Sequence, residues 1–203
     1  GHSVYGYLTE VDAEGRLVGD LAESWDVSAD AKTWIFKLRS GVEFHDGKSL
    51  VPEDVIASLN HHRGEDSRSG VKPLLASVVD IADDGAGGVR FTLAEGNADF
   101  AYIFDDKRLP ILPSKDGALD LSGVGTGGYQ LESIDFGVKA LAKRNPNYWK
   151  QDAAWFDSIE VLAILDVAAR TNALSSGLLD AMDNVDLKTI RLLERNKDIN
   201  IVS

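Results

Sequence analysis

The pair His45-Asp46 is the first candidate for chemistry, within the segment RSGVEFHDGKSLVPEDV of residues 39–55. A histidine beside an aspartate can supply a catalytic base, metal ligands or merely part of a bend. Side chains of neighbouring residues on an extended segment point to opposite sides, so these two are poorly placed to act as one dyad. The following Gly47 completes an Asp-Gly pair, which is a strong turn signal. The pattern therefore favours a bend over a catalytic site.

His61-His62 and the glycine-rich run of residues 123–128 are two further candidates. Adjacent residues on a helix diverge by about 100°, whereas helical metal ligands prefer spacings of three or four residues. The glycine-rich run lacks the Gly-Lys-Ser/Thr of a phosphate loop, and the YQLESI that follows it has the pattern of a strand instead of a helix. We therefore interpret the histidines as a polar helix end and the glycines as a tight turn, with metal and phosphate sites as the alternatives.

A run of four charged residues at 105–108 is the densest charge cluster of the chain and follows an aromatic segment. A glycosidase pair needs carboxylates about 5 to 10 Å apart across a cleft, which adjacent aspartates seldom provide. A solvated helix end is one interpretation. The other is a ligand site, because a guanidinium pairs bidentately with a carboxylate. The candidate ligand-binding residues are those of this segment and one distant lysine: Tyr102, Asp105, Asp106, Lys107, Arg108 and Lys72.

The composition argues against several classes of protein. A chain of 203 residues fits one domain, or one large lobe of a bigger protein. The net charge of −12 disfavours nucleic acid as a partner, because nucleic acid needs clustered lysine and arginine. The absence of cysteine excludes disulfides, thiol catalysis and cysteine-ligated zinc. No nucleophile elbow or nucleotide-binding fingerprint is present, which also tilts the case away from catalysis.

The elements that would position these residues are short strands, glycine turns and isolated helices, which indicates a mixed α/β fold. Alternation of apolar and polar residues predicts half-buried strands, and apolar spacings of three or four residues predict helices. Asp166 and Asp186 are the expected caps of two helices, and Gly177 is the stop of the first. We expect helices over 51–62, 167–177 and 187–196, and strands over 33–39, 88–93, 109–113, 129–134, 158–165, 180–185 and 199–203.

The order of these segments resembles the extracellular solute-binding proteins of family 5, which serve ABC importers of oligopeptides, dipeptides and nickel. The resemblance runs through VYGYLTEVDAEGRLVGDLAESW and FHDGKSLVPEDV, then GVGTGGYQLESI, RNPNYW and FDSIEVLAILDVAARTNALSSGLLDAMD. It implies an α/β (mixed α+β) fold: a type II periplasmic-binding-protein-like lobe that is a fragment of a two-lobed protein. Residues 1–203 would form the first lobe, with an inserted subdomain at about 16–124, part of the main sheet at about 125–203, and the second lobe absent.

The resemblance also implies a function. The protein would be the substrate-binding component of an ABC importer, periplasmic or extracellular, that captures a peptide-like or small chelated solute between two lobes and delivers it to a membrane permease. It would have no catalytic residue, cofactor or metal of its own, and FHDG would be a structural turn. An arginine near the position of Arg108 holds a chelator carboxylate in nickel-type members. The family commonly has proline where this chain has Gly128. An isolated first lobe would expose a sheet edge through which copies could associate.

Two other functions stay open from the residues alone. A hydrolase of peptide-like substrates would use Asp105 or Asp106 with His45, which requires these side chains to converge in space. An interaction domain would bind through exposed helices instead of a cleft. Apolar side chains on a helix that the core does not need would mark such a domain.

Overall fold

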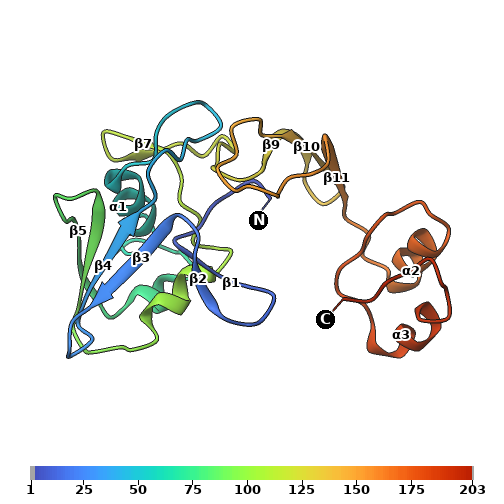
Figure 1. Cartoon of the computed structure of the whole chain (residues 1–203), viewed down its shortest axis with the longest axis horizontal. Helices are drawn as coiled ribbons and strands as arrows, with labels where there is room; N and C mark the ends of the chain where they lie inside the picture. Colours follow the sequence, from blue (N-terminus) through green and yellow to red (C-terminus); the bar gives the residue numbers. More distant parts are fainter. Residues whose placement is uncertain (1–2, 203) are drawn as a thin grey trace. The chain divides into compact units, whose positions relative to one another are not determined.

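An antiparallel sheet of four strands, in the order β3-β4-β6-β5, forms the centre of the first part of the chain (Figure 1). Its strands are β3 (Ala22–Val27), β4 (Thr33–Leu38), β5 (Val78–Asp83) and β6 (Gly88–Leu93). β4 and β6 confirm two of the strands expected from alternation. β5 and β6 are joined by the DDGAGG segment, whose glycines allow the left-handed backbone of a tight turn.

The computed structural model describes residues 3–202, except for the side chains of Leu187 and Leu192. The described residues divide into two units. The first contains the residues up to Ser133 and Leu141–Ile159, and the second contains Ile134–Ala140 and the residues from Glu160 onward. The expected subdomain boundary near residue 125 stays a prediction. Within the described residues, no helix has the length and apolar character needed to cross a membrane.

A cluster of aromatic rings covers one face of the four-stranded sheet. Phe36 on β4 and Phe91 on β6 are completely buried and meet edge to face, with ring centroids 5.4 Å apart. Phe100 and Phe104 pack on them from the 3₁₀ helix η2 (Phe100–Asp105), and Phe104 lies 5.3 Å from Phe36. Edge-to-face packing is a preferred arrangement of aromatic rings. The cluster therefore holds η2 against the sheet and positions the charged run that follows it.

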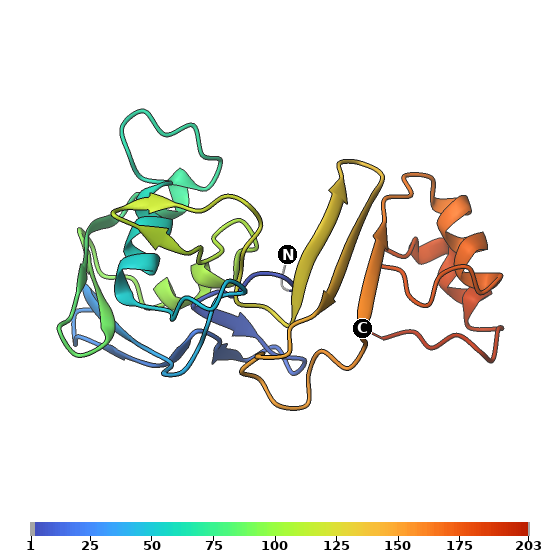
Figure 2. The same cartoon turned by 90° about the horizontal axis from the view of Figure 1, so that it is seen from above.

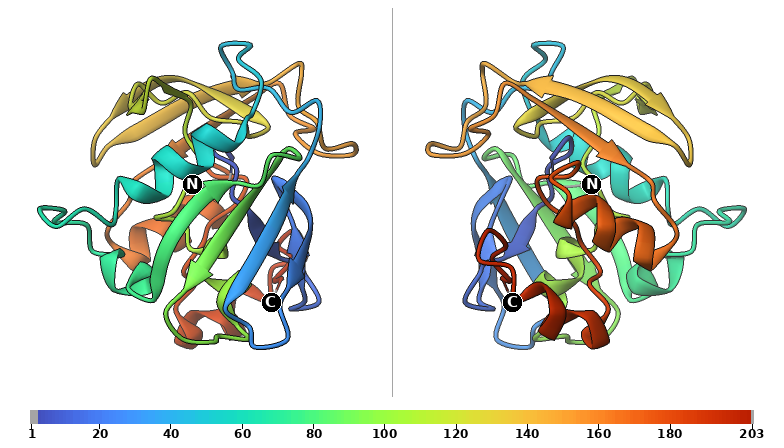
Figure 3. Two further views of the ribbon diagram at one scale, coloured as in Figure 1. Left: turned by 90° about the vertical axis from the view of Figure 1, so that its left-hand side faces the viewer. Right: turned by 90° about the vertical axis from the view of Figure 1, so that its right-hand side faces the viewer.

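Helix α1 (Pro52–Asn60) packs on β5 and β6 and confirms the helix expected at 51–62 (Figure 3). Pro52 is its first residue, where the missing N–H would have no helical partner in any case. Val55 and Leu59 are completely buried, as their spacing of four residues predicted. Asp54 is completely buried as well. A buried carboxylate is rare in proteins unless it is paired, so its partners decide whether this helix is stable.

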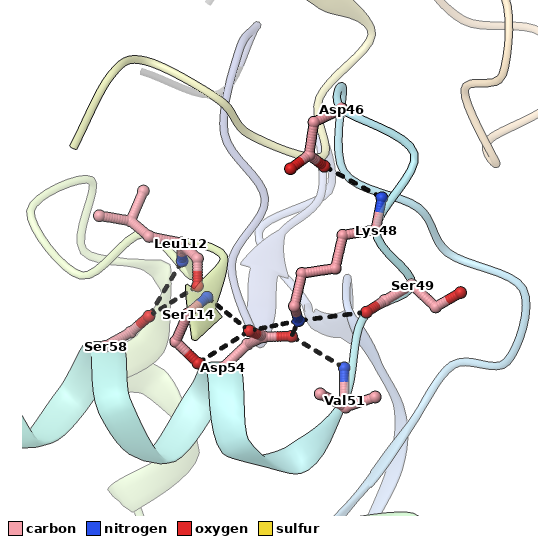
Figure 4. A network of polar contacts seen from close by, with 8 residues as sticks. All are labelled: Asp46, Lys48, Ser49, Val51, Asp54, Ser58, Leu112 and Ser114. Atoms are coloured by element: carbon pink, nitrogen blue, oxygen red, sulfur yellow. Dashed lines mark hydrogen bonds and ion pairs between the residues drawn. The ribbon is translucent and has the colours of Figure 1, made fainter. Parts of the chain in front are cut away.

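The Asp54 carboxylate joins three segments of the chain (Figure 4). Its Oδ1 accepts hydrogen bonds from the N–H and the hydroxyl of Ser114, at 2.7 and 3.0 Å. Its Oδ2 accepts the N–H of Val51 at the start of α1, at 3.0 Å. The Lys48 ammonium lies 2.7 Å from Oδ1. Both oxygens of this buried charge thus have donors, which is what allows it to be buried.

Short elements complete the first unit. β1 (Thr9–Val11) pairs with β2 (Leu17–Gly19) as a hairpin, and β1 packs on η2. A second hairpin of β7 (Ser114–Lys115) and β8 (Ala118–Leu119) packs on α1. The 3₁₀ helix η1 (Lys72–Leu75) precedes β5. These elements place the charged segments around the aromatic core.

The strand expected at 109–113 was wrong. Only an isolated bridge between Gly6 and Ile111 forms there. Pro110 and Pro113 lack the backbone N–H that a continuous ladder needs, so the apolar run crosses the first unit without joining a sheet.

A three-stranded sheet has the order β11-β10-β9 (Figure 2). Its strands are β9 (Tyr129–Asp135), β10 (Lys139–Arg144) and β11 (Ser158–Leu162). β9 and β11 confirm the strands expected at 129–134 and 158–165, although β11 ends three residues early. Together with helices α1, α2 and α3, this sheet confirms the expected mixture of strands and helices.

The second unit contains helices α2 (Val167–Ser175) and α3 (Leu187–Leu193), and both were expected. Asp166 caps α2 by accepting the N–H of Ala169 at 2.7 Å, and the left-handed Gly177 follows its end. The strands expected at 180–185 and 199–203 were wrong for the described residues. Neither 180–185 nor 199–202 pairs with another described segment, and a strand exists only through its neighbour; Ser203 lies outside the described residues.

Replacement of Asp54 tests whether its buried carboxylate holds the first unit together. We expect Asp54→Ala to lower the free energy of unfolding by about 3 kcal/mol, because the N–H groups of Val51 and Ser114 would lose their acceptor. The neighbouring Glu53 is exposed and serves as the control, with an expected loss of about 0.3–1 kcal/mol for Glu53→Ala. Urea unfolding monitored by circular dichroism measures both. Equal losses for the two variants would show that the Asp54 contacts contribute little.

Candidate functional site

The FHDG segment is a bend, as expected. The N–H of Gly47 donates to the carbonyl of Phe44 at 2.9 Å, and the N–H of Phe44 donates to the carbonyl of Lys48 at 2.8 Å. Gly47 has a φ of +85°, which favours glycine at this position. The segment delivers Lys48 to the Asp54 carboxylate, so its role in the first unit is structural.

The side chain of His45 binds the glycine-rich loop at residues 123–128. Its Nδ1 lies 3.2 Å from the N–H of Gly125, and its Nε2 lies 2.9 Å from the carbonyl oxygen of Gly127. A backbone N–H can only donate, so Nδ1 accepts and the ring proton resides on Nε2, which donates to Gly127. Burial lowers the pKa of His45, against the opposing effects of the Gly127 hydrogen bond and Asp46. The imidazole is therefore held neutral in one tautomer.

The glycines of this loop are needed for close packing of backbone. A Cβ added to Gly125 would lie 2.1 Å from the carbonyl oxygen of Val4, and one added to Gly127 would lie 2.6 Å from that of Ser3. Asn145, which the sequence did not single out, donates from Nδ2 to the carbonyl of Gly127 at 3.1 Å. The loop thus packs between the start of the chain and the segment at 145. This contact pattern supports a turn and gives no support to the alternative of a phosphate site.

The charged residues at 105–108 make mainly local contacts. The Arg108 guanidinium donates to both oxygens of Asp106, at 2.9 and 2.6 Å. This hydrogen bond, opposed by slight burial, lowers the pKa of Asp106 to about 2. Asp105 accepts the N–H of Val11 at 3.2 Å, which links the run to β1. Tyr102, one turn earlier, is half exposed.

Lys72 makes its hydrogen bonds to a different segment from the charged run at 105–108. Its ammonium donates to the carbonyls of Gly64 and Glu65, at 2.9 Å each. It lines a surface depression with Arg63, Ser67, Arg68 and Ser69. The six predicted ligand-binding residues therefore fall into two places: Lys72 in this cationic depression, and the others at the end of η2, where Tyr7 donates from its hydroxyl to the carbonyl of Lys107 at 3.2 Å. Whether either place binds a ligand stays a prediction.

His61 and His62 show no paired orientation toward one ligand. Their rings meet nearly perpendicular, with centroids 5.2 Å apart. Nδ1 of His62 lies 2.6 Å from the hydroxyl of Ser69, a hydrogen bond that fixes the loop after α1. These contacts fit the polar helix end that the spacing favoured.

A partly buried ion cluster around Lys150 was missed by sequence reasoning. Its ammonium lies 2.8 Å from Glu10 Oε1 and 2.8 Å from Asp20 Oδ1. Burial alone would lower the pKa of Lys150, but these two carboxylates raise it above the ordinary value. The adjacent Trp149 ring stacks under the Arg39 guanidinium, 4.4 Å from ring centroid to Cζ. The partners are too far apart in sequence for any local pattern to reveal them.

Comparison with protein-family models gives a match over residues 16–203 to the bacterial extracellular solute-binding proteins, family 5. The chain belongs to this family. The glutathione-binding protein GsiB of Escherichia coli strain K12 is 28% identical over 99% of this chain and 40% of the relative. The GsiB of Salmonella typhi is 26% identical with the same coverage. The chain therefore spans about 40% of the length of these relatives.

Solved structures of solute-binding proteins share the fold. The binding protein AgaA of A. tumefaciens R10, in complex with agropinic acid, matches with a TM-score of 0.87 and 25% identity over 96% of this chain and 40% of its own. A nickel ABC transporter protein of Bacillus halodurans matches with a TM-score of 0.81 and 30% identity over 97% of this chain and 40% of its own. These matches confirm the expected periplasmic-binding-protein-like fold.

The comparisons also decide between binding and catalysis. The relatives named above are binding proteins and a transporter component, which confirms the expectation of a binding protein instead of an enzyme. The family is described as extracellular, in agreement with the expected location. The hydrolase interpretation was wrong on geometry too, because His45 uses both ring nitrogens on the backbone of Gly125 and Gly127.

The neutral state of His45 makes stability depend on pH. Its folded pKa lies below the ordinary value of about 6.5, so the unfolded chain binds more protons as pH falls below that value. We therefore expect the free energy of unfolding to fall as the pH drops below about 6.5, and this slope to shrink in His45→Gln. Burial and then His61 also lower the pKa of His62, so His62→Gln is the matched control and removes a separate share of the slope. An unchanged slope in His45→Gln would contradict the assigned neutral state of the folded His45 ring.

Proposed function

We propose that this chain is the first lobe of the substrate-binding component of an ABC importer. The observation that supports this most directly is the family match over residues 16–203, together with the fold agreement over 96% of the chain. Relatives named for glutathione and for agropinic acid indicate the class of solute. We infer a small polar solute, peptide-like or chelated, that carries at least one carboxylate.

The proposed mechanism is capture by closure of two lobes. Because the chain spans about 40% of its relatives, we assign the remaining solute contacts to a second lobe. Sites of this kind enclose most of the surface of a ligand, so the solute favours the closed state over the open one. This component makes and breaks no bond, and the permease in the membrane receives the loaded form. Within the lobe, we assign residues 16–124 to an inserted subdomain and 125–203 to the main sheet.

Two cationic places in the first lobe are candidates for the solute carboxylate. The Lys72 ammonium has three N–H donors, and two of them are used on the carbonyls of Gly64 and Glu65. Its third donor can bind a carboxylate within the depression that Arg68 also lines. At the end of η2, Arg108 would have to exchange Asp106 for the solute. In a chain of net charge −12, such local positive charge is the feature that would select an anionic group.

The solute itself can be recovered from the two-lobed protein. We expect the protein purified without denaturation to retain a small molecule, which native and denatured mass spectra would reveal as a mass difference. The 203-residue chain alone should bind that molecule weakly or not detectably, because half of the enclosing surface is missing. Tight binding by the chain alone, or an empty protein that cleaves added peptides, would overturn the proposal.

Substitutions then distinguish the two candidate places. In the two-lobed protein, Lys72→Ala or Arg108→Ala should weaken binding of the recovered solute by about 10- to 100-fold, the contribution of a hydrogen bond to a charged group. Arg16→Ala is the control, because Arg16 forms a similar local ion pair with Asp12 at 2.8 Å in the β1–β2 turn. Isothermal titration calorimetry measures the affinities. Losses no larger than that of the control would reject both places.

Self-association of the isolated chain is also part of the proposal. The strands β3 and β5 are the two edges of the four-stranded sheet. Their residues Val27 and Val79 are 50% and 61% exposed, so each edge presents an apolar side chain to a second copy. On β5, the Arg63 guanidinium already binds the carbonyls of Val78 and Val79, which leaves β3 the more accessible edge.

A further inference from the structure

The chain contains three Asp-Gly pairs, and an Asp-Gly peptide bond can rearrange without an enzyme. Glycine has no side chain to shield its nitrogen from the carboxyl carbon of the preceding aspartate. The reaction needs a glycine N–H that is free to attack and a carboxyl group that is free to be protonated. Hydrogen bonds in the folded chain therefore decide which pair reacts, among Asp46-Gly47, Asp84-Gly85 and Asp116-Gly117.

In the pair Asp46-Gly47, hydrogen bonds hold both reacting groups, which are the Asp46 carboxylate and the Gly47 N–H. The Asp46 Oδ1 accepts the N–H of Lys48 at 3.0 Å. The attacking group, the N–H of Gly47, donates to the carbonyl of Phe44 at 2.9 Å. Two hydrogen bonds must break before this pair can react.

The pair Asp84-Gly85 is held in the same way. The Asp84 Oδ1 accepts the N–H groups of Ala86 and Gly88, at 2.7 and 2.8 Å, and these bonds lower the pKa of the carboxyl. The N–H of Gly85 donates to Asp83 Oδ1 at 2.8 Å. The carboxylate is thus stabilised in its ionised form, which is a poor electrophile.

The pair Asp116-Gly117 has none of this protection. The two residues form the exposed turn between β7 and β8, where Lys115 pairs with Ala118. Within residues 3–202, neither the Asp116 carboxylate nor the Gly117 N–H has a hydrogen-bond partner. Asp116 also has a φ of +52°, a left-handed conformation that is strained for a residue with a side chain.

We propose that Asp116-Gly117 is a site of spontaneous isoaspartate formation in the folded protein, and that the other two pairs are protected. The nitrogen of Gly117 attacks Cγ of Asp116. Its proton and one proton from solvent leave with a carboxylate oxygen as water, which gives a five-membered succinimide. Water then adds to the α-carbonyl and opens the ring to isoaspartate, returning one proton to solvent. The mass is unchanged, but the main chain gains one methylene group.

The extra methylene would lengthen a turn of only two residues, Asp116 and Gly117, between the paired residues Lys115 and Ala118. Ser114, two residues before Asp116, pairs with Leu119 across the hairpin. The same Ser114 supplies two of the donors to the buried Asp54 carboxylate, as Figure 4 shows. A longer turn therefore changes the hairpin register next to the network that joins α1 to β7. The product would be a substrate for enzymes that methylate isoaspartyl carboxylates.

Site-resolved ageing of the folded protein tests the proposal. After incubation at neutral pH, proteolytic peptides are assayed for isoaspartate by methyl transfer from S-adenosylmethionine with an isoaspartate methyltransferase. We expect isoaspartate at residue 116 to exceed that at residue 46 or 84 by roughly tenfold or more, because two hydrogen bonds hold the pair at 46 and three hold the pair at 84. In urea-unfolded chain, the three sites should react at similar rates.

The variant Asp116→Gly is the control. Glycine accepts the left-handed turn without strain and carries no carboxyl group, so the hairpin should form and the signal at 116 should vanish. Comparable isoaspartate at the three sites of the folded protein would overturn the proposal. So would a leading signal at 46 or 84, or no signal at 116 under conditions where the unfolded chain reacts.

Discussion

The buried Asp54 carboxylate is the interaction on which the arrangement of the first unit depends. A charge with no exposed surface is stable only if each of its oxygens is hydrogen-bonded or paired. Asp54 meets this requirement with donors from the FHDG bend, the helix start and the β7–β8 hairpin. The helix cannot shift relative to Lys48 or to the β7–β8 hairpin without breaking these bonds. Ser58, also buried on α1, adds hydrogen bonds to the backbone of Leu112, so polar contacts at two positions fix how the helix sits.

The glycine-rich loop shows a second constraint, which is the close approach of main chain to main chain. Gly125 and Gly127 pack against Val4 at distances that leave no room for a Cβ. His45 then accepts the N–H of Gly125 and donates to the carbonyl of Gly127, which it shares with the Asn145 amide. Histidine suits the task because a neutral imidazole donates from one nitrogen and accepts at the other. In this chain, the FHDG bend and the glycine-rich loop thus serve packing and hydrogen bonding.

Local elements were predictable from the sequence, and long-range partners were not. The strands β4 and β6 and the helices α1 and α2 follow from side-chain spacing and caps, which act within a few residues. The segment 180–185 has apolar residues but no neighbouring strand, and no local pattern reports a missing neighbour. The bend at FHDG was foreseen, yet the partners of His45 lie about 80 residues later. The candidate ligand residues were foreseen by charge, but the ion pair that occupies Arg108 was not.

The ion cluster around Lys150 has a consequence for the order in which the chain folds. Lys150 and Glu10 are separated by 140 residues, and His45 and Gly127 by 82. Contacts of such separation form late, since the loop between them must close first. During vectorial synthesis, the segment at Glu10 would emerge from the ribosome long before its partner exists. The ion pair of Glu10 can therefore form only after residue 150 has been made.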